Sequence, residues 1–327
     1  MFHCIDTSQF DRSFLEKISK IAEAARKVSR TKEGADWLTS LLSHRRAMLY
    51  FVQPSTRTFL SFLSACQILG MKTADVRDTS TSSEVKGESE LDTVRTFSSY
   101  YDVIIMRHPK PNFAREIADM LDNSNRPVPV INGGSGRDQH PTQALLDVYT
   151  LINSFEQRGG IDGKKIAFVG DLIRGRTARS LSILLTRFQD VKQYFVAPDF
   201  LQMDKSILSF LDEQGVSYEF AYNINSVLPY VDALYLTRLQ DEWDEAENTG
   251  DVYNVEDFAI SKSNIHKLHS NAVIMHPLPR RQEISHKVDN DPRAMYWRQV
   301  RNGMWARVAL MAEIFGVQEK IIEFQSI

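Results

Sequence analysis

The chain has 327 residues, more than one simple core usually holds, so about two domains are expected. A formal net charge of -3 argues against a broad nucleic-acid-binding surface, and two distant cysteines, Cys4 and Cys66, offer no disulfide framework. Neither a signal-peptide pattern nor an apolar run of roughly 20 residues is present, so we expect a cytoplasmic protein with no nucleic-acid or membrane partner.

Short β-rich runs alternate with helical patterns along the chain. This alternation predicts βαβ units and parallel sheets, whose ligands bind at the carboxyl ends of the strands. Strands are expected at 48–52, 73–76, 103–106, 128–131, 165–169, 193–196, 232–236 and 272–275, and helices are expected to begin near Arg57, Glu88, Phe113, Pro141, Arg176, Asp204 and Ile224. The polar loop at 157–165 is the expected internal boundary, so two α/β domains joined by the helix from Pro141 are the simplest architecture.

The first strand is followed by the run Pro54-Ser55-Thr56-Arg57-Thr58 and then by a helical pattern. Ser55 therefore lies near a helix N-terminus, where unpaired backbone N–H groups and the positive end of the helix dipole favour an anion. Arg57 adds a forked, permanently charged donor that matches phosphate oxygens. The run predicts a phosphate site, and the alternative is a Ser/Thr helix cap with a surface arginine.

Several later strands are also followed by polar or charged residues. Because ligands of parallel sheets bind at such strand ends, these residues are candidates for binding and catalysis. The motifs are Arg107-His108-Pro109 after 103–106, Gly133-Gly134-Ser135-Gly136 and then His140-Pro141-Thr142-Gln143 after 128–131, Gly175-Arg176-Thr177 after 165–169, Thr237-Arg238-Leu239-Gln240 after 232–236, and His276-Pro277-Leu278-Pro279-Arg280 after 272–275.

These positions also have structural interpretations. His140 could simply begin a helix, because Pro141 suits the first helical position, and Arg176 and Arg238 could form surface ion pairs. The glycine-rich run could be only a turn.

Other classes of site lack their signatures. The sequence contains neither GxGxxG nor GxxxxGK[ST], which argues against a dinucleotide or P-loop site. No carboxylate is spaced like a metal ligand from His266, His269 or His276, so no metal site is expected.

Taken in order, the strand-end motifs resemble the aspartate/ornithine carbamoyltransferase family. The resemblance runs from about residue 48 to about residue 316 and is closer to the aspartate branch than to the ornithine branch. Ornithine enzymes typically carry Cys where this chain has Pro277, and their Ser-Met-Gly loop is absent.

The resemblance implies two parallel α/β domains, with the C-terminal helix returning to the first. Residues 1–150 with a C-terminal helix at 303–327 would bind carbamoyl phosphate, and residues 151–302 would bind the amino acid. The implied activity transfers the carbamoyl group of carbamoyl phosphate to the amino group of L-aspartate, giving N-carbamoyl-L-aspartate and phosphate, a step of pyrimidine biosynthesis. A homotrimer with shared active sites is also implied, and a regulatory or metabolic partner protein is left open.

The phosphate is expected to be held by four consecutive residues. The resemblance gives this role to Ser55, Thr56, Arg57 and Thr58. In the loop at 81–88, Ser82 and Lys86 match family residues that reach into the active site of a neighbouring subunit.

The carbamoyl group has its own implied contacts. Arg107 would bridge the phosphate and the carbonyl oxygen, His140 and Thr58 would donate to that oxygen, and Gln143 would accept from the NH2 group. Attack by an amine places negative charge on the carbonyl oxygen and then on phosphate, so fixed donors act as an oxyanion hole, where losing one costs about 2.7–4 kcal/mol. The expected catalytic residues are Arg57, Thr58, Lys86, Arg107 and His140, and no metal, redox cofactor or covalent nucleophile is required.

The amino acid is expected to bind the second half of the chain. The resemblance implies that Arg176, Arg238 and Gln240 bind its carboxylates. Leu278, next to Pro277, lies where a backbone carbonyl orients the attacking amine.

Some positions depart from the residue types that aspartate enzymes of the family usually carry. The usual Glu before the phosphate motif is Gln53, the basic and acidic residues after it are Phe59 and Leu63, and a usual Arg beyond Arg-x-Gln is Trp243. The segment 241–247 is strongly acidic. The carbamoyl-phosphate half therefore matches the family, whereas the acceptor half is altered.

Three hypotheses follow. The first is a carbamoyltransferase that uses aspartate or a different amino acceptor. The second is a catalytically weak carbamoyltransferase-like binding or scaffold protein, and the third is a nucleotide-binding α/β enzyme.

Overall fold

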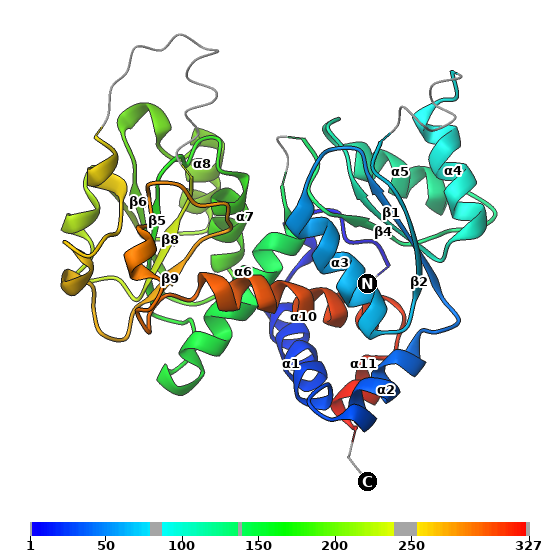
Figure 1. Cartoon of the computed structure of the whole chain (residues 1–327). Helices are drawn as coiled ribbons and strands as arrows, with labels where there is room; N and C mark the ends of the chain where they lie inside the picture. Colours follow the sequence, from blue (N-terminus) through cyan, green and yellow to red (C-terminus); the bar gives the residue numbers. More distant parts are fainter. Residues whose placement is uncertain (1, 79–86, 137–138, 239–253, 325–327) are drawn as a thin grey trace. The chain divides into compact units, whose positions relative to one another are not determined.

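The computed structural model describes residues 2–78, 87–136, 139–238 and 254–324. The chain divides into two compact units (Figure 1). The first unit comprises Met1–Tyr149 and Arg301–Ile327, and the second comprises Thr150–Val300. Each unit contains one parallel sheet with helices, so the predicted fold class of two parallel-sheet α/β domains is confirmed.

A four-stranded parallel sheet in the order β2-β1-β3-β4 forms the centre of the first unit. β1 and β3 are almost entirely buried, which explains their nearly continuous apolar sequences. Phe51 pairs with Arg107, and Met106 pairs with Asn132, so the last residues of β1, β3 and β4 lie at one edge of the sheet. The strands are β1 (Arg46–Phe51), β2 (Lys72–Val76), β3 (Val103–Arg107) and β4 (Val130–Asn132).

Helices of the first unit come from both ends of the chain. Local capping fixes several of their starts, because Asp11 accepts from the N–H of Phe14 and Ser89 accepts from the N–H of Asp92. The last helix, α11, packs against α1, so the end of the chain returns to this unit as expected. The helices are α1 (Arg12–Val28), α2 (Lys32–Leu41), α3 (Thr56–Ile68), α4 (Glu90–Tyr100), α5 (Phe113–Asp122) and α11 (Gln318–Ile322), while α6 (Pro141–Phe155) and α10 (Tyr296–Ile314) contribute residues to both units.

The second unit is built around a five-stranded parallel sheet in the order β7-β6-β5-β8-β9. Its core is lined by alternating side chains of β5, β6 and β8, including Val169, Val196 and Leu236. The main elements are β5 (Lys165–Val169), α7 (Arg176–Leu185), β6 (Lys192–Val196), α8 (Lys205–Glu213), β7 (Tyr218–Ala221), β8 (Ala233–Leu236) and β9 (Val273–Met275).

Several elements differ from the sequence-based expectations, and the first two helices, α1 and α2, were not among the expected ones. β7 was not expected; it is an edge strand with Phe220 exposed, so it lacks the continuous apolar run of a buried strand. The helix expected near Ile224 is only a 3-10 turn (Ile224–Ser226), because Pro229 cannot donate the backbone hydrogen bond that a longer helix needs. The C-terminal helix expected at 303–327 instead begins at Tyr296 and ends at Ile314, where Gly316 takes a left-handed conformation before α11.

Within the described ranges, no helix combines the length and the apolar character that crossing a bilayer requires.

Candidate active site

The phosphate motif lies at the start of α3. Ser55 occupies the N-cap, but its hydroxyl makes no capping hydrogen bond to the helix. Thr56 and Arg57 begin the helix with exposed side chains, whereas Thr58 is buried. The simple helix-cap interpretation of Ser55 is therefore wrong, and the backbone N–H groups of the first turn retain their attraction for an anion.

A pair of glycines after β4 brings three predicted site residues together. The Arg107 guanidinium donates from Nη1 to the carbonyl oxygen of Gly133 at 3.2 Å. A Cβ atom at Gly134 would lie 2.7 Å from Arg107 Nη1 and 2.9 Å from His140 Cδ2, and one at Gly133 would lie 3.6 Å from Thr58 Cγ2. Gly134 also has a φ of +105°, which side chains rarely adopt. Thr58, Arg107 and His140 thus gather around a loop that only glycine fits.

Asn132 at the end of β4 holds this glycine loop. Its Oδ1 accepts from the backbone N–H of Gly134 at 2.8 Å and from the Ser135 hydroxyl at 3.0 Å. Its Nδ2 donates to the carbonyl oxygen of Ile5 at 2.9 Å. Sequence reasoning missed Asn132, although a polar residue that ends an apolar strand directly before two glycines is a usable signal.

The start of α6 orients His140 and Gln143. The backbone N–H of Gln143 is shared between the carbonyl oxygen of His140 at 3.0 Å and Nδ1 of the same residue at 3.3 Å. Because Nδ1 accepts, the proton of the neutral ring lies on Nε2. That atom would lie 3.1 Å from a Cβ at Gly134. The Gln143 side chain donates from Nε2 to Oδ1 of Asp147 at 2.9 Å. His140 therefore presents a donor beside the glycine loop, as an oxyanion site requires.

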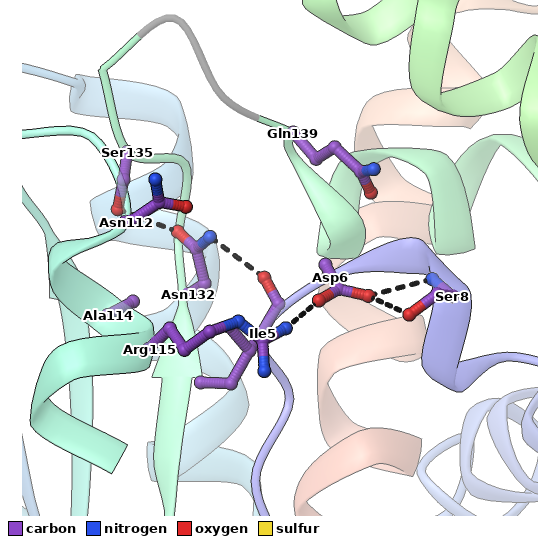
Figure 2. Close-up of a pocket in the computed structure, with 9 residues that line it drawn as sticks. All are labelled: Ile5, Asp6, Ser8, Asn112, Ala114, Arg115, Asn132, Ser135 and Gln139. Carbon is purple, nitrogen blue, oxygen red and sulfur yellow. Dashed lines mark hydrogen bonds and ion pairs between the residues drawn. The ribbon is translucent and has the colours of Figure 1, made fainter. Parts of the chain in front are cut away.

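A pocket of about 330 Å³ adjoins the same loop and is drawn in Figure 2. Asp6 accepts from the Ser8 N–H at 2.9 Å and forms an ion pair with Arg115, and Asn132 reaches the backbone of Ile5. The pocket meets the glycine loop at Asn132 and at Ser135 of the glycine-rich candidate motif, but none of the residues to which the resemblance assigns a role lines it. Its walls are Ile5, Asp6, Ser8, Asn112, Ala114, Arg115, Asn132, Ser135 and Gln139.

In the second unit, two predicted arginines follow neighbouring strands. Arg176 is the first residue of α7 and Arg238 follows β8; both side chains are half-buried. The strand ends are tied together because Thr237 donates from Oγ1 to the carbonyl oxygen of Val169 at 3.1 Å. A Cβ at Gly170 would lie 2.5 Å from the Thr237 carbonyl oxygen, so this close approach also depends on glycine.

Leu278 is held by a buried histidine in the loop after β9. Nδ1 of His276 accepts from the Leu278 N–H at 2.7 Å, and Nε2 lies 2.7 Å from Oε1 of Glu283. Leu278 has a φ of +58°, a conformation that Leu rarely adopts. Burial raises the pKa of Glu283, but the hydrogen bond and charge of His276, together with backbone N–H donors, outweigh it and hold that pKa below its usual range. A buried polar pair therefore fixes the backbone at the predicted amine-orienting position.

Some predicted residues lie outside the described ranges. These are Ser82, Lys86, Gln240 and Trp243. Within the described ranges, no group of three or more His, Cys, Asp or Glu side chains is placed to hold a metal ion.

Two family models match the chain. The model for the aspartate/ornithine carbamoyltransferase, carbamoyl-P binding domain, matches residues 3–153. The model for the aspartate/ornithine carbamoyltransferase, Asp/Orn binding domain, matches residues 162–314.

Similar proteins carry consistent names. The chain is 40% identical over 314 residues to a chloroplastic aspartate carbamoyltransferase of Oryza sativa subsp. japonica, covering 94% of this chain and 83% of the relative. It is 40% identical over 312 residues to the aspartate carbamoyltransferase catalytic subunit of Vibrio cholerae, covering 95% of each chain. Among solved structures, aspartate transcarbamoylase from Trypanosoma cruzi in complex with N-(phosphonacetyl)-L-aspartic acid is 35% identical with a TM-score of 0.84, covering 95% of this chain and 94% of that one. The catalytic subunit of M. jannaschii aspartate transcarbamoylase is 36% identical with a TM-score of 0.82, covering 98% and 99% of the two chains.

Proposed function

Because the chain belongs to the aspartate/ornithine carbamoyltransferase family, we propose that it transfers the carbamoyl group of carbamoyl phosphate to L-aspartate. The products are N-carbamoyl-L-aspartate and phosphate, which makes the reaction a step of pyrimidine biosynthesis. The observation that carries the proposal is the gathering of Thr58, Arg107 and His140 around the two glycines after β4. The aspartate branch is supported by the names of the relatives, of which the Vibrio cholerae subunit matches over nearly its whole length.

The start of α3 is the proposed phosphate site. The N–H groups of its first turn, the hydroxyls of Ser55, Thr56 and Thr58 and the guanidinium of Arg57 supply donors for a doubly charged leaving group. Such donors stabilise phosphate as the bond between the carbonyl carbon and the phosphate oxygen breaks.

The carbonyl oxygen is the proposed target of Thr58, Arg107 and His140. The aspartate nitrogen bonds to the carbonyl carbon, negative charge grows on the carbonyl oxygen, phosphate departs with the bonding electrons, and the nitrogen loses a proton. Arg107 and the Nε2 proton of His140 offer fixed donors to that oxygen. Buried, preorganised donors of this kind supply the largest single part of many rate enhancements.

Aspartate is the proposed ligand of the second unit. Arg176, Arg238 and Gln240 would bind its two carboxylates, because guanidinium groups match carboxylate oxygens in pairs. The Leu278 carbonyl, fixed through His276, would accept a hydrogen bond from the amine. Gln53 and Trp243 depart from the residue types usual at these positions in aspartate enzymes of the family, so the acceptor is tested with a panel of amino acids.

Purified protein incubated with carbamoyl phosphate and a panel of amino acids tests the function. Ureido product is expected with L-aspartate, and D-aspartate, L-glutamate and L-ornithine are the matched controls. If product formed only with another amine, that amine would replace L-aspartate as the proposed acceptor. An absence of product with every amine would overturn the proposal in favour of binding without turnover.

Ligand binding provides a second readout. N-(phosphonacetyl)-L-aspartic acid, the ligand of the Trypanosoma cruzi structure, joins both halves of the expected substrates in one molecule. It should raise the melting temperature more than phosphate and aspartate added together at equal concentrations, because a single ligand loses translational freedom only once. A nucleotide that shifts the melting temperature instead would support a nucleotide-binding enzyme.

A homotrimer with shared sites is the assembly that we infer from the family resemblance. Ser82 and Lys86 would act in the site of the neighbouring subunit. Light scattering should give the mass of three chains, and a mixture of Arg57→Ala and Lys86→Ala proteins that have exchanged subunits should recover partial activity. Recovery requires that one site draws the two residues from different chains, so no recovery would place both in the same chain. The cytoplasmic location and any regulatory or metabolic partner stay predictions.

A further inference from the structure

The side-chain amide of Gln143 has two ends of similar size, of which Oε1 accepts hydrogen bonds and Nε2 donates them. Which of these two atoms faces a ligand depends on the hydrogen-bond partner of the other atom. Nε2 donates to Oδ1 of Asp147, about one helical turn further along α6, at 2.9 Å. An ionised carboxylate only accepts, so the reversed amide would place two acceptors against each other. Asp147 thereby makes Oε1 the end of Gln143 that accepts from a ligand.

Asp147 is fully buried, and a buried carboxylate needs a counter-charge. Arg307 in α10 is a cation that is itself 3% exposed and that interacts electrostatically with Asp147. Burial lowers the pKa of Arg307 to about 10, while Asp147 opposes that lowering, so Arg307 remains a cation at neutral pH. A nearby cation favours the ionised form of a carboxylate. Both residues belong to the first unit.

Contacts with two helices hold Arg307 in place. Its Nη1 donates to the Ser61 hydroxyl at 2.9 Å, and its Nη2 donates to the Thr142 hydroxyl at 3.4 Å. Its guanidinium carbon lies 4.7 Å from the centre of the Phe62 ring. Since Ser61 and Phe62 belong to α3 and Thr142 to α6, the cation is fixed between the helix that begins at the phosphate motif and the helix that carries Asp147.

The first turn of α6 therefore offers one donor and one acceptor. His140 presents the Nε2 proton because its Nδ1 accepts from the Gln143 N–H, and Gln143 presents Oε1. A carbamoyl group carries the complementary pair, a carbonyl oxygen and an NH2 group, on one carbon. An acetyl group has the same oxygen but a methyl group in place of NH2, so it would leave the Gln143 acceptor unpaired. We propose that Asp147 is a positioning residue that, through Gln143, selects carbamoyl phosphate over acetyl phosphate.

The proposal rests on the proposed function, and a donor comparison tests it. The measurements are kcat/KM for carbamoyl phosphate and the inhibition constant of acetyl phosphate, which differs from the substrate only in CH3 for NH2. In Asp147→Asn, residue 147 can donate as well as accept a hydrogen bond. The side-chain amide of Gln143 can therefore flip and exchange the positions of Oε1 and Nε2. We expect kcat/KM to fall about 10- to 100-fold while the acetyl phosphate constant changes less than about 3-fold.

Tyr149→Phe is the matched control, because it removes a different polar contact on the same helix, from the Tyr149 hydroxyl to Glu23 Oε2 at 3.2 Å. This variant should leave the discrimination between carbamoyl phosphate and acetyl phosphate unchanged. If Asp147→Asn weakened the use of carbamoyl phosphate and the binding of acetyl phosphate equally, the role of Asp147 would be merely structural and the proposal would be overturned.

A double variant tests whether Asp147 acts through Gln143. In Gln143→Ala, discrimination should already be reduced, and adding Asp147→Asn should reduce it no further. A further loss of discrimination in the double variant would show that Asp147 does not act through Gln143. If Asp147→Asn does not fold, Asp147→Ser carries the same comparison, because its smaller side chain leaves room for water.

Measurements on the wild-type protein test the proposed function separately from the role of Asp147. Wild-type turnover with aspartate supports the proposed function whatever the variants do. If the wild type binds carbamoyl phosphate without turnover, the donor comparison is made on dissociation constants. Equal wild-type affinity for the two acyl phosphates would overturn the inference alone.

Discussion

The two units of the molecule hold their expected site residues in different ways. In the first unit, Thr58, Arg107 and His140 come from separate segments but all lie against the same two glycines. In the second unit, Arg238 follows β8, whose end is tied to β5 through Thr237, whereas Leu278 lies in a separate loop after β9 and is held by His276. A single backbone change at the glycines of the first unit should therefore disturb all three groups, whereas a backbone change in the second unit should not disturb both Arg238 and Leu278.

The largest effect is expected for Arg57→Ala, which removes the charged donor at the start of α3. Turnover should fall about 10³-fold, because the departing phosphate loses a charge-assisted contact in the transition state. Steady-state kinetics with saturating aspartate measure it. Arg12→Ala, which removes a partly exposed arginine paired with Glu16 in the same unit, should have little effect. Activity near the wild-type level in Arg57→Ala would remove Arg57 from the phosphate site.

Arg238→Ala tests whether the second unit acts on the acceptor alone. We expect the KM for aspartate to rise about 10- to 100-fold, because a carboxylate loses a charged hydrogen-bond donor, while the KM for carbamoyl phosphate stays within about 2-fold. Lys205→Ala removes an exposed cation from the same unit and is the control. Equal changes in both constants would contradict the division of substrates between the units.

Gly134→Ala tests the dependence of the first site on one loop. Gly134 and Gly316 both have positive φ, but a Cβ would meet Arg107 and His140 at Gly134 and nothing within 4 Å at Gly316. Both variants should lose about 1–2 kcal/mol of stability from backbone strain. Only Gly134→Ala should also lower kcat, by about 10-fold, in proportion to the displacement of donors from the carbonyl oxygen. A similar loss of activity in both variants would mean that the strain, and not the contact, matters.

The smallest effect is expected for Glu283→Gln in the second unit. The native pKa of Glu283 lies below its usual value of 4.5, so the charged group stabilises the fold above that pH, and this contribution is lost as pH falls through the native pKa. Glu283→Gln keeps the acceptor for His276 but not the charge, so it should cost about 1 kcal/mol at neutral pH. Urea unfolding should show that the difference between variant and wild type narrows well below pH 4.5. A difference that stays constant with pH would show that the charge of Glu283 contributes nothing.

The sequence was informative where local pattern and function coincide. Arg107 and His140 could be found because they follow apolar runs at the carboxyl ends of predicted strands, and parallel sheets place such ends at one edge. The phosphate motif could be placed at a helix start for the same local reason.

Features that depend on tertiary packing could not be predicted in the same way. Arg307 lies in a long helix near the end of the chain, and no local pattern indicates that it is buried beside Asp147. The Gln143 amide orientation depends on that distant pair. The edge strand β7 was missed because half of its side chains are exposed, so burial does not impose a continuous apolar sequence.

The position of Arg307 also bears on how the chain is made. The first unit is interrupted in sequence by the whole of the second, and its core is completed only when residues 301–324 have been added. Domains commonly fold in the order of synthesis, but here the whole of the second unit lies between Asp147 and Arg307 in the sequence, so the two charges cannot meet until that unit has been synthesised. Without Arg307 the first unit lacks the charge that favours burial of an ionised Asp147, so the second unit can complete its fold before the first.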